Sequence, residues 1–359
     1  MSAAPEAPAR TPAMVLGGTG YVAGELLRLI AAHPRLELAG VLSDGQPGTP
    51  VAAAFPHLRS VYPALRFADS SEIESLLRRT PSSALFCAAP HGVAAALIDR
   101  LLGAAEAGGS HAHCVDISAD FRYATAAAYE AVYKHAHGAP ARIGQFTCAL
   151  PEHLASAPTP HISHPGCFAT AALLASVPLL ALGWVEPQLY LSGVTGSTGS
   201  GRKPVEGTHH PLRHGDLYAY GALAHRHAPE IAAGARRASG VDAQISFVPH
   251  SGPFARGIHM TVQAALKRPL SSAEAQAGLA EFYRGRPFVR VVEAPPRVKD
   301  VATSNYAHLH AATDGATIAV MCVLDNLNKG AAGGGMQWMN RLLGFEEALG
   351  LGAPAPGWT

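Results

Sequence analysis

A glycine-rich turn near the N-terminus places the strongest constraint on how this chain can fold. Residues 17–24 read Gly-Gly-Thr-Gly-Tyr-Val-Ala-Gly and lie between a short apolar run and a segment with leucine and isoleucine at helical spacing. Glycines at such a junction permit a tight turn and let a pyrophosphate approach the backbone, while the helix start offers unpaired N–H groups. This strand–turn–helix context predicts a nicotinamide dinucleotide site. The residues expected to contact the dinucleotide here are Gly17, Thr19, Gly20, Tyr21 and Val22.

Short apolar runs alternate with helical patterns through the first half of the chain. After the run that precedes the glycine turn, further runs cover residues 36–42, 84–88 and 114–117. Strands that alternate with helices indicate a parallel sheet with helices on both faces. We therefore expect an α/β protein that begins with a Rossmann-type dinucleotide-binding domain over residues 13–163.

Longer strand patterns with fewer helices between them are typical of the second half. Residues 258–264, for example, alternate apolar and polar side chains as a half-buried strand does. This predicts an α+β domain with a mixed sheet over residues 164–329. Residues 330–359 are expected to contain a C-terminal helix that packs back on the first domain, and the Ala- and Pro-rich residues 1–12 are expected to form a disordered tail.

Composition narrows the class of protein further. The chain has 359 residues, which corresponds to roughly two domains of about 150 residues each. Its formal net charge is +1 and no run of Lys or Arg stands out, which argues against a nucleic-acid partner. The sequence lacks an apolar stretch long enough to span a membrane, and its N-terminus lacks the pattern of a signal peptide. We therefore expect a cytoplasmic protein that binds a small molecule.

One of the five cysteines stands in a reactive context. The odd number and wide spacing fit neither a disulfide framework nor a zinc pattern. Cys167 follows His-Pro-Gly and begins an apolar helical pattern. A helix start lowers the pKa of a thiol, and its N–H groups can hold an oxyanion. Cys167 is therefore the predicted nucleophile, and the other four cysteines are expected to be small core residues.

His225 and His227 open another helical pattern and are candidates for proton transfer. A thiolate nucleophile needs a partner that exchanges protons near neutral pH, and histidine is the usual one. Metal binding is an alternative, because His209, His210 and His214 lie nearby in the sequence. No further ligand follows at a recognisable second spacing, so no metal is expected. A metal-dependent hydrolase built on this cluster stays open as a rival hypothesis.

Residues 196–203 form a second glycine-rich loop with two cations. They read Gly-Ser-Thr-Gly-Ser-Gly-Arg-Lys, but Arg202 stands where a Walker motif requires Lys, so a nucleotide triphosphatase is not expected. Backbone N–H groups and two cations still suit an anion. Arg256, just before a strand, is a further candidate for anion binding.

The second predicted strand ends at Ser43 and Asp44. An acidic residue at this position usually binds the ribose hydroxyls of NAD, whereas serine without the acid suits the 2′-phosphate of NADP. Ser43 is therefore a candidate cofactor residue, and the residues alone leave the choice between NAD and NADP open.

Several stretches after the N-terminal tail match one known family together, although no one of them would be specific. They are residues 17–26, 90–92 (Pro-His-Gly), 115–122 (Val-Asp-Ile-Ser-Ala-Asp-Phe-Arg), 165–167 (Pro-Gly-Cys), 192–204, 225–231 (His-Arg-His-Ala-Pro-Glu-Ile), 254–258 and 325–333. On these stretches the chain resembles the N-acetyl-gamma-glutamyl-phosphate reductase family of arginine biosynthesis. That family is similar in plan to aspartate-semialdehyde dehydrogenase.

The resemblance implies a role for each matching residue. It implies that Cys167 forms a thioester from an acyl phosphate, and that His227, with His225 second, is the acid/base residue. It places Arg202 and Arg256 near the substrate's phosphate and carboxylate. The remaining residues implied to bind substrate or cofactor are Arg122 for the substrate, and Pro90 and Asn326 for the dinucleotide. NADP as cofactor, and a homodimer or homotetramer built through the second domain's sheet, are also implied.

Two local departures from the usual pattern keep a related substrate open. Phe168 and Ala169 follow the cysteine where Tyr and Pro are usual, and residues 208–211 read Thr-His-His-Pro. Both features resemble a branch that reduces an aminoadipyl phosphate on a carrier protein in lysine biosynthesis. The sequence therefore predicts the acyl-phosphate chemistry and leaves the aminoadipyl substrate as an alternative.

Overall fold

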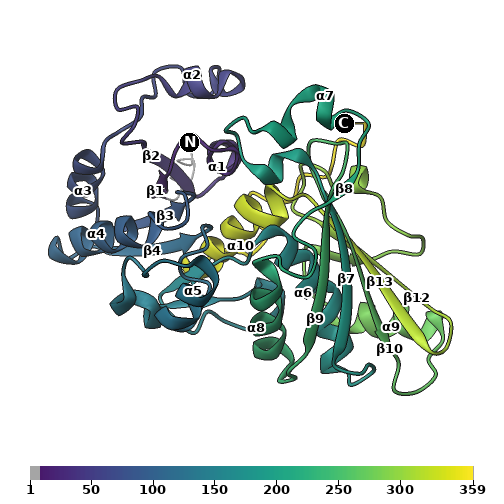
Figure 1. The fold of residues 1–359 in the computed structure, drawn as a ribbon. Helices are drawn as coiled ribbons and strands as arrows, with labels where there is room; N and C mark the ends of the chain where they lie inside the picture. Colours follow the sequence, from purple (N-terminus) through teal and green to yellow (C-terminus); the bar gives the residue numbers. More distant parts are fainter. Residues whose placement is uncertain (1–8, 359) are drawn as a thin grey trace, which may run out of the picture.

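The computed structural model, which describes residues 9–358, contains two sheets (Figure 1). The first sheet has six strands in the order β2-β1-β3-β4-β6-β5, and every pairing in it is parallel. These strands are β1 (Thr11–Leu16), β2 (Leu36–Leu42), β3 (Ser82–Cys87), β4 (His111–Asp116), β5 (Phe146–Cys148) and β6 (His161–Ser163). This arrangement confirms the predicted Rossmann-type α/β architecture.

Helices cover both faces of this sheet because its central strands are apolar on both sides. In β1, Ala13 and Val15 pack into the core that contains α1, whereas Met14 and Leu16 point to the opposite face and into the core of α3 and α4. The helices of this half are α1 (Tyr21–Ala32), α2 (Val51–Ala54), α3 (Ser70–Arg79), α4 (Ala94–Ala107) and α5 (Ala126–Tyr133).

The second sheet is mixed, with seven strands in the order β11-β12-β13-β10-β7-β9-β8. It combines parallel and antiparallel pairs, which confirms the predicted mixed sheet. Its strands are β7 (Gln188–Thr195), β8 (Tyr218–Ala219), β9 (Gln244–Ser251), β10 (Ile258–Ala265), β11 (Val289–Val291), β12 (Ala307–Thr313) and β13 (Thr317–Leu324).

Only one face of the second sheet is covered by helices in the described chain. Helices α6 (Cys167–Ala181), α8 (His227–Ser239) and α9 (Ser272–Phe282) pack on or beside that face, and α7 (His210–Arg213) is a short helix in the loop before β8. Residues along β7 alternate between buried and more exposed positions, and Tyr190 on the uncovered face is 56% exposed. The sheet therefore presents a broad open face.

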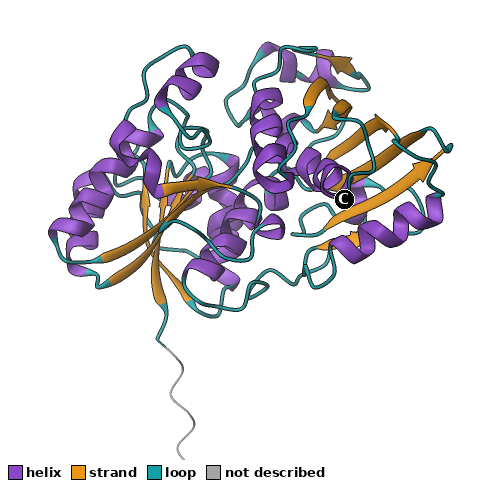
Figure 2. Cartoon of the chain, turned by 90° about the horizontal axis from the view of Figure 1, so that it is seen from below, coloured by secondary structure: helices purple, strands orange, loops and turns teal. Residues whose placement is uncertain are grey.

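Figure 2 shows the two sheets side by side, each with helices packed against it. Helix α6 lies between the second sheet and α8. It is apolar all round, and nearly all of its side chains are buried. Because α6 begins at Cys167, this packing brings the cysteine to the junction between the sheets. None of the helices within residues 9–358 is both long and apolar enough to cross a membrane.

The two ends of the chain differ in detail from the expected pattern. Residues 1–8 of the expected N-terminal tail lie outside the described residues, but Thr11 and Pro12 belong to β1, because they pair with β2. At the other end, the helix α10 (Gly333–Leu342) is shorter than the 330–359 segment and follows a π-helical turn, Asn328–Ala332. Helix α10 packs against α1 and β4 of the first half.

Candidate active site

Two helices of separate halves begin at the same pocket. Helix α1 follows Gly20 and helix α6 follows Gly166. Because glycine has no side chain, neither residue can cap the N–H groups of its helix. Residues of both helix starts, Gly20 and Tyr21 on one side and Gly166 and Cys167 on the other, line this pocket. Two helix starts, each with N–H groups that lack a partner within the helix, therefore border one pocket.

The turn before the first helix requires glycine at residues 17 and 18. Gly17 has a φ of +80°, and a Cβ there would lie 2.5 Å from the Cα of Ala89. A Cβ on Gly18 would lie 2.6 Å from the side chain of Val41, whereas no atom lies within 4 Å of the Cβ position on Gly20. The loop thus closes on the sheet while its outer side stays open, which fits the pyrophosphate of a dinucleotide.

The predicted cofactor residues lie along two adjoining pockets. These pockets share Gly20, the segment Ala88–Pro90 and Arg202 at their common border. Thr19 and Ser43 line the outer pocket, at the end of β2. The complete predicted set in the two pockets is Gly17, Thr19, Gly20, Tyr21, Val22, Ser43, Pro90 and Asn326. A dinucleotide could therefore extend from the end of β2 to Cys167.

Asn326 reaches the pocket from the segment after β13 and is held by two loops. Its amide Nδ2 donates to Thr198 Oγ1 at 3.0 Å, and its Oδ1 accepts the backbone N–H of Gly257 at 2.7 Å. The side chain thus fixes the pocket wall by joining the loops after β7 and before β10.

Cys167 is partly exposed to the pocket and is packed tightly on its other side. A Cβ on Gly330, in the π-helical turn, would lie 2.8 Å from the Cβ of Cys167. Burial raises the pKa of the thiol above its usual value, although the Arg122 guanidinium and the helix N–H groups act to lower that pKa. The expected lowering of the pKa by the helix start is therefore outweighed by burial, and the thiol needs a base.

His227 is placed to be that base. Its side chain is only 7% exposed, and burial, reinforced by Arg122 and His225, holds its pKa well below the usual value. The imidazole is therefore neutral at neutral pH and can accept a proton. Its Nε2 lies beside residues 164–167, which we call the cysteine turn, because a Cβ on Gly166 would lie 2.6 Å from that atom.

His225 lies behind His227 and makes no comparable approach to the main pocket. Its Nδ1 accepts the backbone N–H of His227 at 3.2 Å, and burial lowers its pKa to about 4. It lines a neighbouring pocket together with Cys167 and His227. This geometry favours His227 for proton transfer and leaves His225 as its support.

A buried ion pair joins Arg122 to Glu230 beneath the cysteine turn. Arg122 Nη1 donates to Glu230 Oε2 at 3.1 Å, and the other Glu230 oxygen accepts the backbone N–H of Gly166 at 2.7 Å. Arg122 also donates to the carbonyl oxygens of His164 and Ile117. The pair therefore fixes the backbone next to Cys167 and places a positive charge beside the thiol.

Sequence reasoning assigned no role to Glu230. A usable signal was present, because Glu230 follows His227 by three residues on α8 and such residues share a helix face. The partner Arg122 is more than one hundred positions away, and only the fold brings the two together.

The stretch 115–122 acts as a scaffold for Arg122. Asp116 accepts the backbone N–H groups of Ser118 at 2.9 Å and Phe121 at 3.3 Å, which shapes the turn after β4. Asp120 accepts the N–H groups of Gly92 and Ala95 at the start of α4. These carboxylates stabilise the loop, and Arg122 at its end donates to the carbonyl oxygen of His164, three residues before Cys167.

The other two predicted arginines, Arg202 and Arg256, lie in different places: one lines the pockets and the other does not. Arg202 lines both pockets, donates to the carbonyl oxygen of Thr19 at 3.1 Å and lies over the ring of Phe55. Arg256 does not line either pocket. Its guanidinium pairs with Asp325 and with Glu25 of α1, so that it ties the two halves together. The position of Arg256 therefore does not support the expected contact with substrate.

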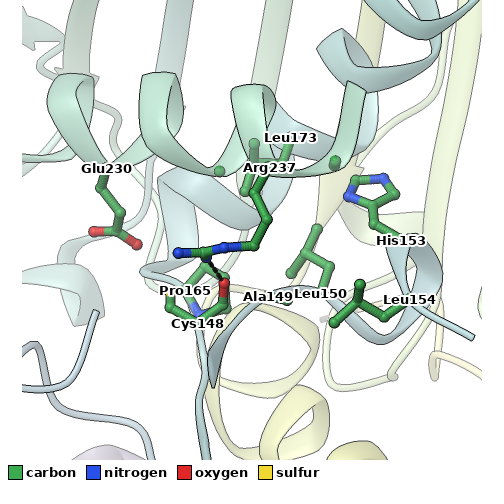
Figure 3. A pocket seen from close by; sticks show the side chains of 11 residues that line it. Cys148, Ala149, Leu150, His153, Leu154, Pro165, Leu173, Glu230 and Arg237 are labelled. Atoms are coloured by element: carbon green, nitrogen blue, oxygen red, sulfur yellow. Dashed lines mark hydrogen bonds between the residues drawn. The ribbon is translucent and has the colours of Figure 1, made fainter. Parts of the chain in front are cut away.

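A separate, mostly apolar pocket lies behind the cysteine turn (Figure 3). Glu230 and Arg237 project from α8 toward it, and Arg237 donates to the carbonyl oxygen of Cys148. Pro165 and Leu173 form part of its wall. Glu230 thus has the cysteine turn on one side and this apolar pocket on the other.

The histidines of residues 209–227 do not assemble into a metal site. Across residues 9–358, no group of three or more His, Cys, Asp or Glu side chains lies close enough to hold a metal ion. The hydrolase hypothesis therefore has no structural support, whereas a dinucleotide pocket that ends at a cysteine and a neutral histidine does.

The fold and the site together define a class, the semialdehyde dehydrogenases. Residues 12–153 match the family described as "Semialdehyde dehydrogenase, NAD binding domain", and residues 167–326 match "Semialdehyde dehydrogenase, dimerisation domain". These matches confirm the prediction of a nicotinamide dinucleotide enzyme with a dimerisation domain.

Within that class, the chain belongs to the N-acetyl-gamma-glutamyl-phosphate reductase family. It is 37% identical to the N-acetyl-gamma-glutamyl-phosphate reductase of Pseudomonas aeruginosa over 346 residues, with 94% of this chain and 96% of that protein covered. It is also 37% identical to the reductase of Azotobacter vinelandii over 348 residues, with the same coverage. The family resemblance found in the sequence motifs is thereby confirmed.

Solved structures of more distant proteins share the fold. Aspartate semialdehyde dehydrogenase II of Vibrio cholerae, complexed with ASA, matches with a TM-score of 0.68 and 13% identity over 94% of this chain and 98% of that chain. A probable aspartate-semialdehyde dehydrogenase of Pseudomonas aeruginosa matches with a TM-score of 0.64 and 19% identity over 93% of this chain and 98% of that one. Both confirm the architecture.

Proposed function

We propose that this protein reduces N-acetyl-gamma-glutamyl phosphate to N-acetylglutamate 5-semialdehyde and phosphate, with NADPH as reductant, in arginine biosynthesis. The observation that carries the proposal is the meeting of two helix starts at one pocket. A glycine cradle for the dinucleotide lies on one side, and Cys167 with a neutral His227 lies on the other. The names of relatives that are 37% identical over nearly the full chain support the substrate.

The first half of the reaction forms a thioester on Cys167. His227 accepts the thiol proton as the sulfur attacks the acyl carbon, and phosphate leaves as the C–O bond breaks. Backbone N–H groups at the start of α6 stabilise the oxyanion that forms on the carbonyl oxygen. Arg122 beside the turn favours the thiolate, because its positive charge acts to lower the pKa of the thiol.

The second half releases the aldehyde. The two adjoining pockets would hold NADPH, which would supply a hydride for the thioester carbon when bound. The chain's own residues then handle the proton: the imidazolium of His227 protonates the oxyanion and takes the proton back as the C–S bond breaks. Cys167 leaves as a thiolate beside Arg122, and the imidazolium of His227 returns its proton to the sulfur, which restores the thiol and the neutral imidazole for the next acyl phosphate. Splitting the reaction in this way holds the acyl group in place while the hydride is transferred.

The substrate's negative groups need cations at the pocket. Arg202 and Arg226 both line it, and Arg226 is exposed. We infer that these two arginines bind the phosphate and the carboxylate of the substrate, since a guanidinium binds both groups in a bidentate manner. Arg122 has its nitrogens engaged by protein oxygens and contributes charge rather than a free clamp.

We further propose a cytoplasmic homo-oligomer, a dimer or a tetramer, in which a second copy covers the open face of the mixed sheet. The family match to a dimerisation domain over residues 167–326 supports this. The uncovered face includes exposed side chains such as Tyr190 and Gln263, and tyrosine is enriched where one protein surface contacts another.

The test runs the reaction backwards, because acyl phosphates hydrolyse in water. Purified protein is mixed with N-acetylglutamate semialdehyde, inorganic phosphate and NADP⁺, and NADPH formation is followed by absorbance. We expect a signal that requires phosphate and is lost in Cys167→Ala, because the thioester cannot form without the thiol.

Two other results would change the proposal in different ways. A signal with an aminoadipate semialdehyde, and none with the glutamate-derived aldehyde, would keep the mechanism and replace the substrate. NADPH formation that persists in Cys167→Ala would contradict the covalent mechanism itself.

A further inference from the structure

The acidic residue at the end of β2, Asp44, lines the outer cofactor pocket, but its carboxylate is hydrogen-bonded to the start of α3. In a dinucleotide fold, a carboxylate at this place binds the ribose hydroxyls of NAD and repels the 2′-phosphate of NADP. Here Ser70, at the start of α3, donates its backbone N–H to Asp44 Oδ1 at 2.9 Å, and its hydroxyl oxygen lies 2.7 Å from each carboxylate oxygen. The carboxylate is therefore already engaged by α3.

A cation from the other half of the molecule lies on the same pocket. Arg202, held by Thr19 and Phe55, fixes the loop after β7 above the glycine cradle. The next residue, Lys203, lines the outer pocket together with Ser43 and Asp44, and it does not line the inner pocket that contains Cys167. Lys203 is therefore confined to the outer pocket, whereas Arg202 also lines the pocket that contains Cys167.

Lys203 has no charged partner of its own. Its side chain is exposed, and it takes part in none of the ion pairs formed within residues 9–358. Two other cations are nearby. The guanidinium of Arg66 donates to the carbonyl oxygen of Gly48 at 2.6 Å, and Arg202, which lines the same pocket, donates to the carbonyl oxygen of Thr19. Of these three cations, Lys203 is the one that makes no such contact within residues 9–358 and remains available to a phosphate at the end of β2.

We propose that Lys203 and the Ser43 hydroxyl bind the 2′-phosphate of NADP, while Ser70 holds Asp44 away from that phosphate. The inference rests on the NADP-dependent function proposed above and identifies the residues that select NADP over NAD. Ser43 belongs to the first half and Lys203 to the loop after β7. The 2′-phosphate therefore bridges the two halves across the pocket.

The test measures binding and needs no turnover. Adenosine 2′,5′-bisphosphate and 5′-AMP differ only in the 2′-phosphate, and calorimetry on the full chain gives the affinity for each. We expect the wild-type protein to bind the bisphosphate more tightly. Lys203→Gln should weaken bisphosphate binding by about tenfold or more, the usual value of a charged hydrogen bond, and leave 5′-AMP binding unchanged.

Arg66→Gln is the matched control, because it removes a nearby cation that the structure pairs elsewhere. It should alter neither affinity. Ser70→Ala tests the other half of the proposal. It removes both hydroxyl contacts and leaves only the backbone N–H bond to Asp44 Oδ1, so the carboxylate is held less firmly and the bisphosphate should bind more weakly. Adding Asp44→Asn should restore its affinity.

Three results would overturn the inference. The first is an equal affinity of the wild-type protein for both ligands. The second is an equal loss of affinity for both ligands in Lys203→Gln. The third is a loss of the preference for the bisphosphate in Arg66→Gln but not in Lys203→Gln. These results are distinguishable from a failure of the proposed function. The reverse reaction can show phosphate-dependent NADPH formation when the binding test fails, and the binding test can succeed when that reaction gives no signal.

Discussion

The two helix starts at the pocket share a glycine before the first helical residue, but their surroundings differ. Both α1 and α6 follow a glycine, and both begin at the same pocket. At the start of α1, an added Cβ on Gly20 would have no neighbour within 4 Å. At the start of α6, a Cβ on Gly166 would meet His227 at 2.6 Å and Arg122 at 2.8 Å.

The difference shows how a bare helix start becomes a catalytic one. The α1 start relies on backbone geometry, which is sufficient to hold a phosphate whose charge is already fixed. In the proposed mechanism, the α6 start creates a charge on sulfur and removes it again. That mechanism assigns the base to His227, and the Arg122–Glu230 pair influences the thiol pKa and holds the turn in position.

The largest expected effect is at His227. His227→Asn removes the proton acceptor and should lower turnover by roughly 10²-fold or more, the usual contribution of general acid–base catalysis. Binding of NADP⁺, measured by calorimetry, should be unchanged, because the residue belongs to the α6 side of the pocket.

His225→Asn is the matched control for this experiment. The Nδ1 atom of His225 accepts the backbone N–H of His227, so His225 supports His227 without replacing its side chain. The loss of the His225 imidazole should therefore reduce turnover much less. A greater loss at His225 than at His227 would reassign the proton transfer, and weaker dinucleotide binding in His227→Asn would contradict the separation of the two helix starts.

The Arg122–Glu230 pair should control the reactivity of Cys167 with opposite signs. Arg122 acts to lower the thiol pKa and Glu230 acts to raise it, while burial keeps it above the usual value. The rate of iodoacetamide alkylation in the wild-type protein should therefore still increase with pH above about 9, the region where an ordinary thiol is already ionised. At pH 8, Arg122→Gln should slow alkylation and Glu230→Gln should accelerate it.

Cys167→Ala provides the background for these rates, because the other four cysteines are buried. Alkylation that reaches a plateau near neutral pH would contradict the raised pKa. Glu230→Gln also leaves Arg122 buried without its counter-ion, which should reduce the free energy of unfolding by about 3–5 kcal/mol. Denaturant unfolding measures this loss and defines the conditions under which the variant remains folded.

The parts of the molecule that the sequence predicted best are those whose physics is local. The glycine turn, the alternation of strands and helices, and the cysteine at a helix start each depend on a few adjacent residues. All eight predicted cofactor residues accordingly line the two adjoining pockets. The mixed second sheet was also predictable, because the alternation in residues 258–264 reflects one covered face.

The parts that escaped prediction depend on burial and on distant partners. The thiol pKa of Cys167 was expected to be lowered, but the sequence does not show how deeply the turn is packed. Arg256 had the residue type and position of an anion clamp, yet Glu25 and Asp325 bind it, and their proximity arises only in the fold. Glu230 was missed because its two partners lie on other elements.

The smallest effects come from one methyl group placed on each helix start. Gly20 and Gly166 have negative φ values of −79° and −60° with extended ψ, so alanine is compatible with both backbones. Gly166→Ala should cost about 1–3 kcal/mol of stability, the usual cost of overpacking, and should displace His227. Gly20→Ala should change stability by less than about 0.5 kcal/mol, as at an open surface position.

Thermal unfolding and calorimetry separate the two variants. Gly166→Ala should melt at a lower temperature and lose turnover while it still binds NADP⁺. Gly20→Ala should keep its melting temperature and alter only the affinity for NADP⁺, because its methyl group occupies space that the dinucleotide would use. Equal losses of stability in the two variants would mean that the α1 start is as crowded as the α6 start. The contrast between an open cradle and a packed catalytic turn would then be wrong.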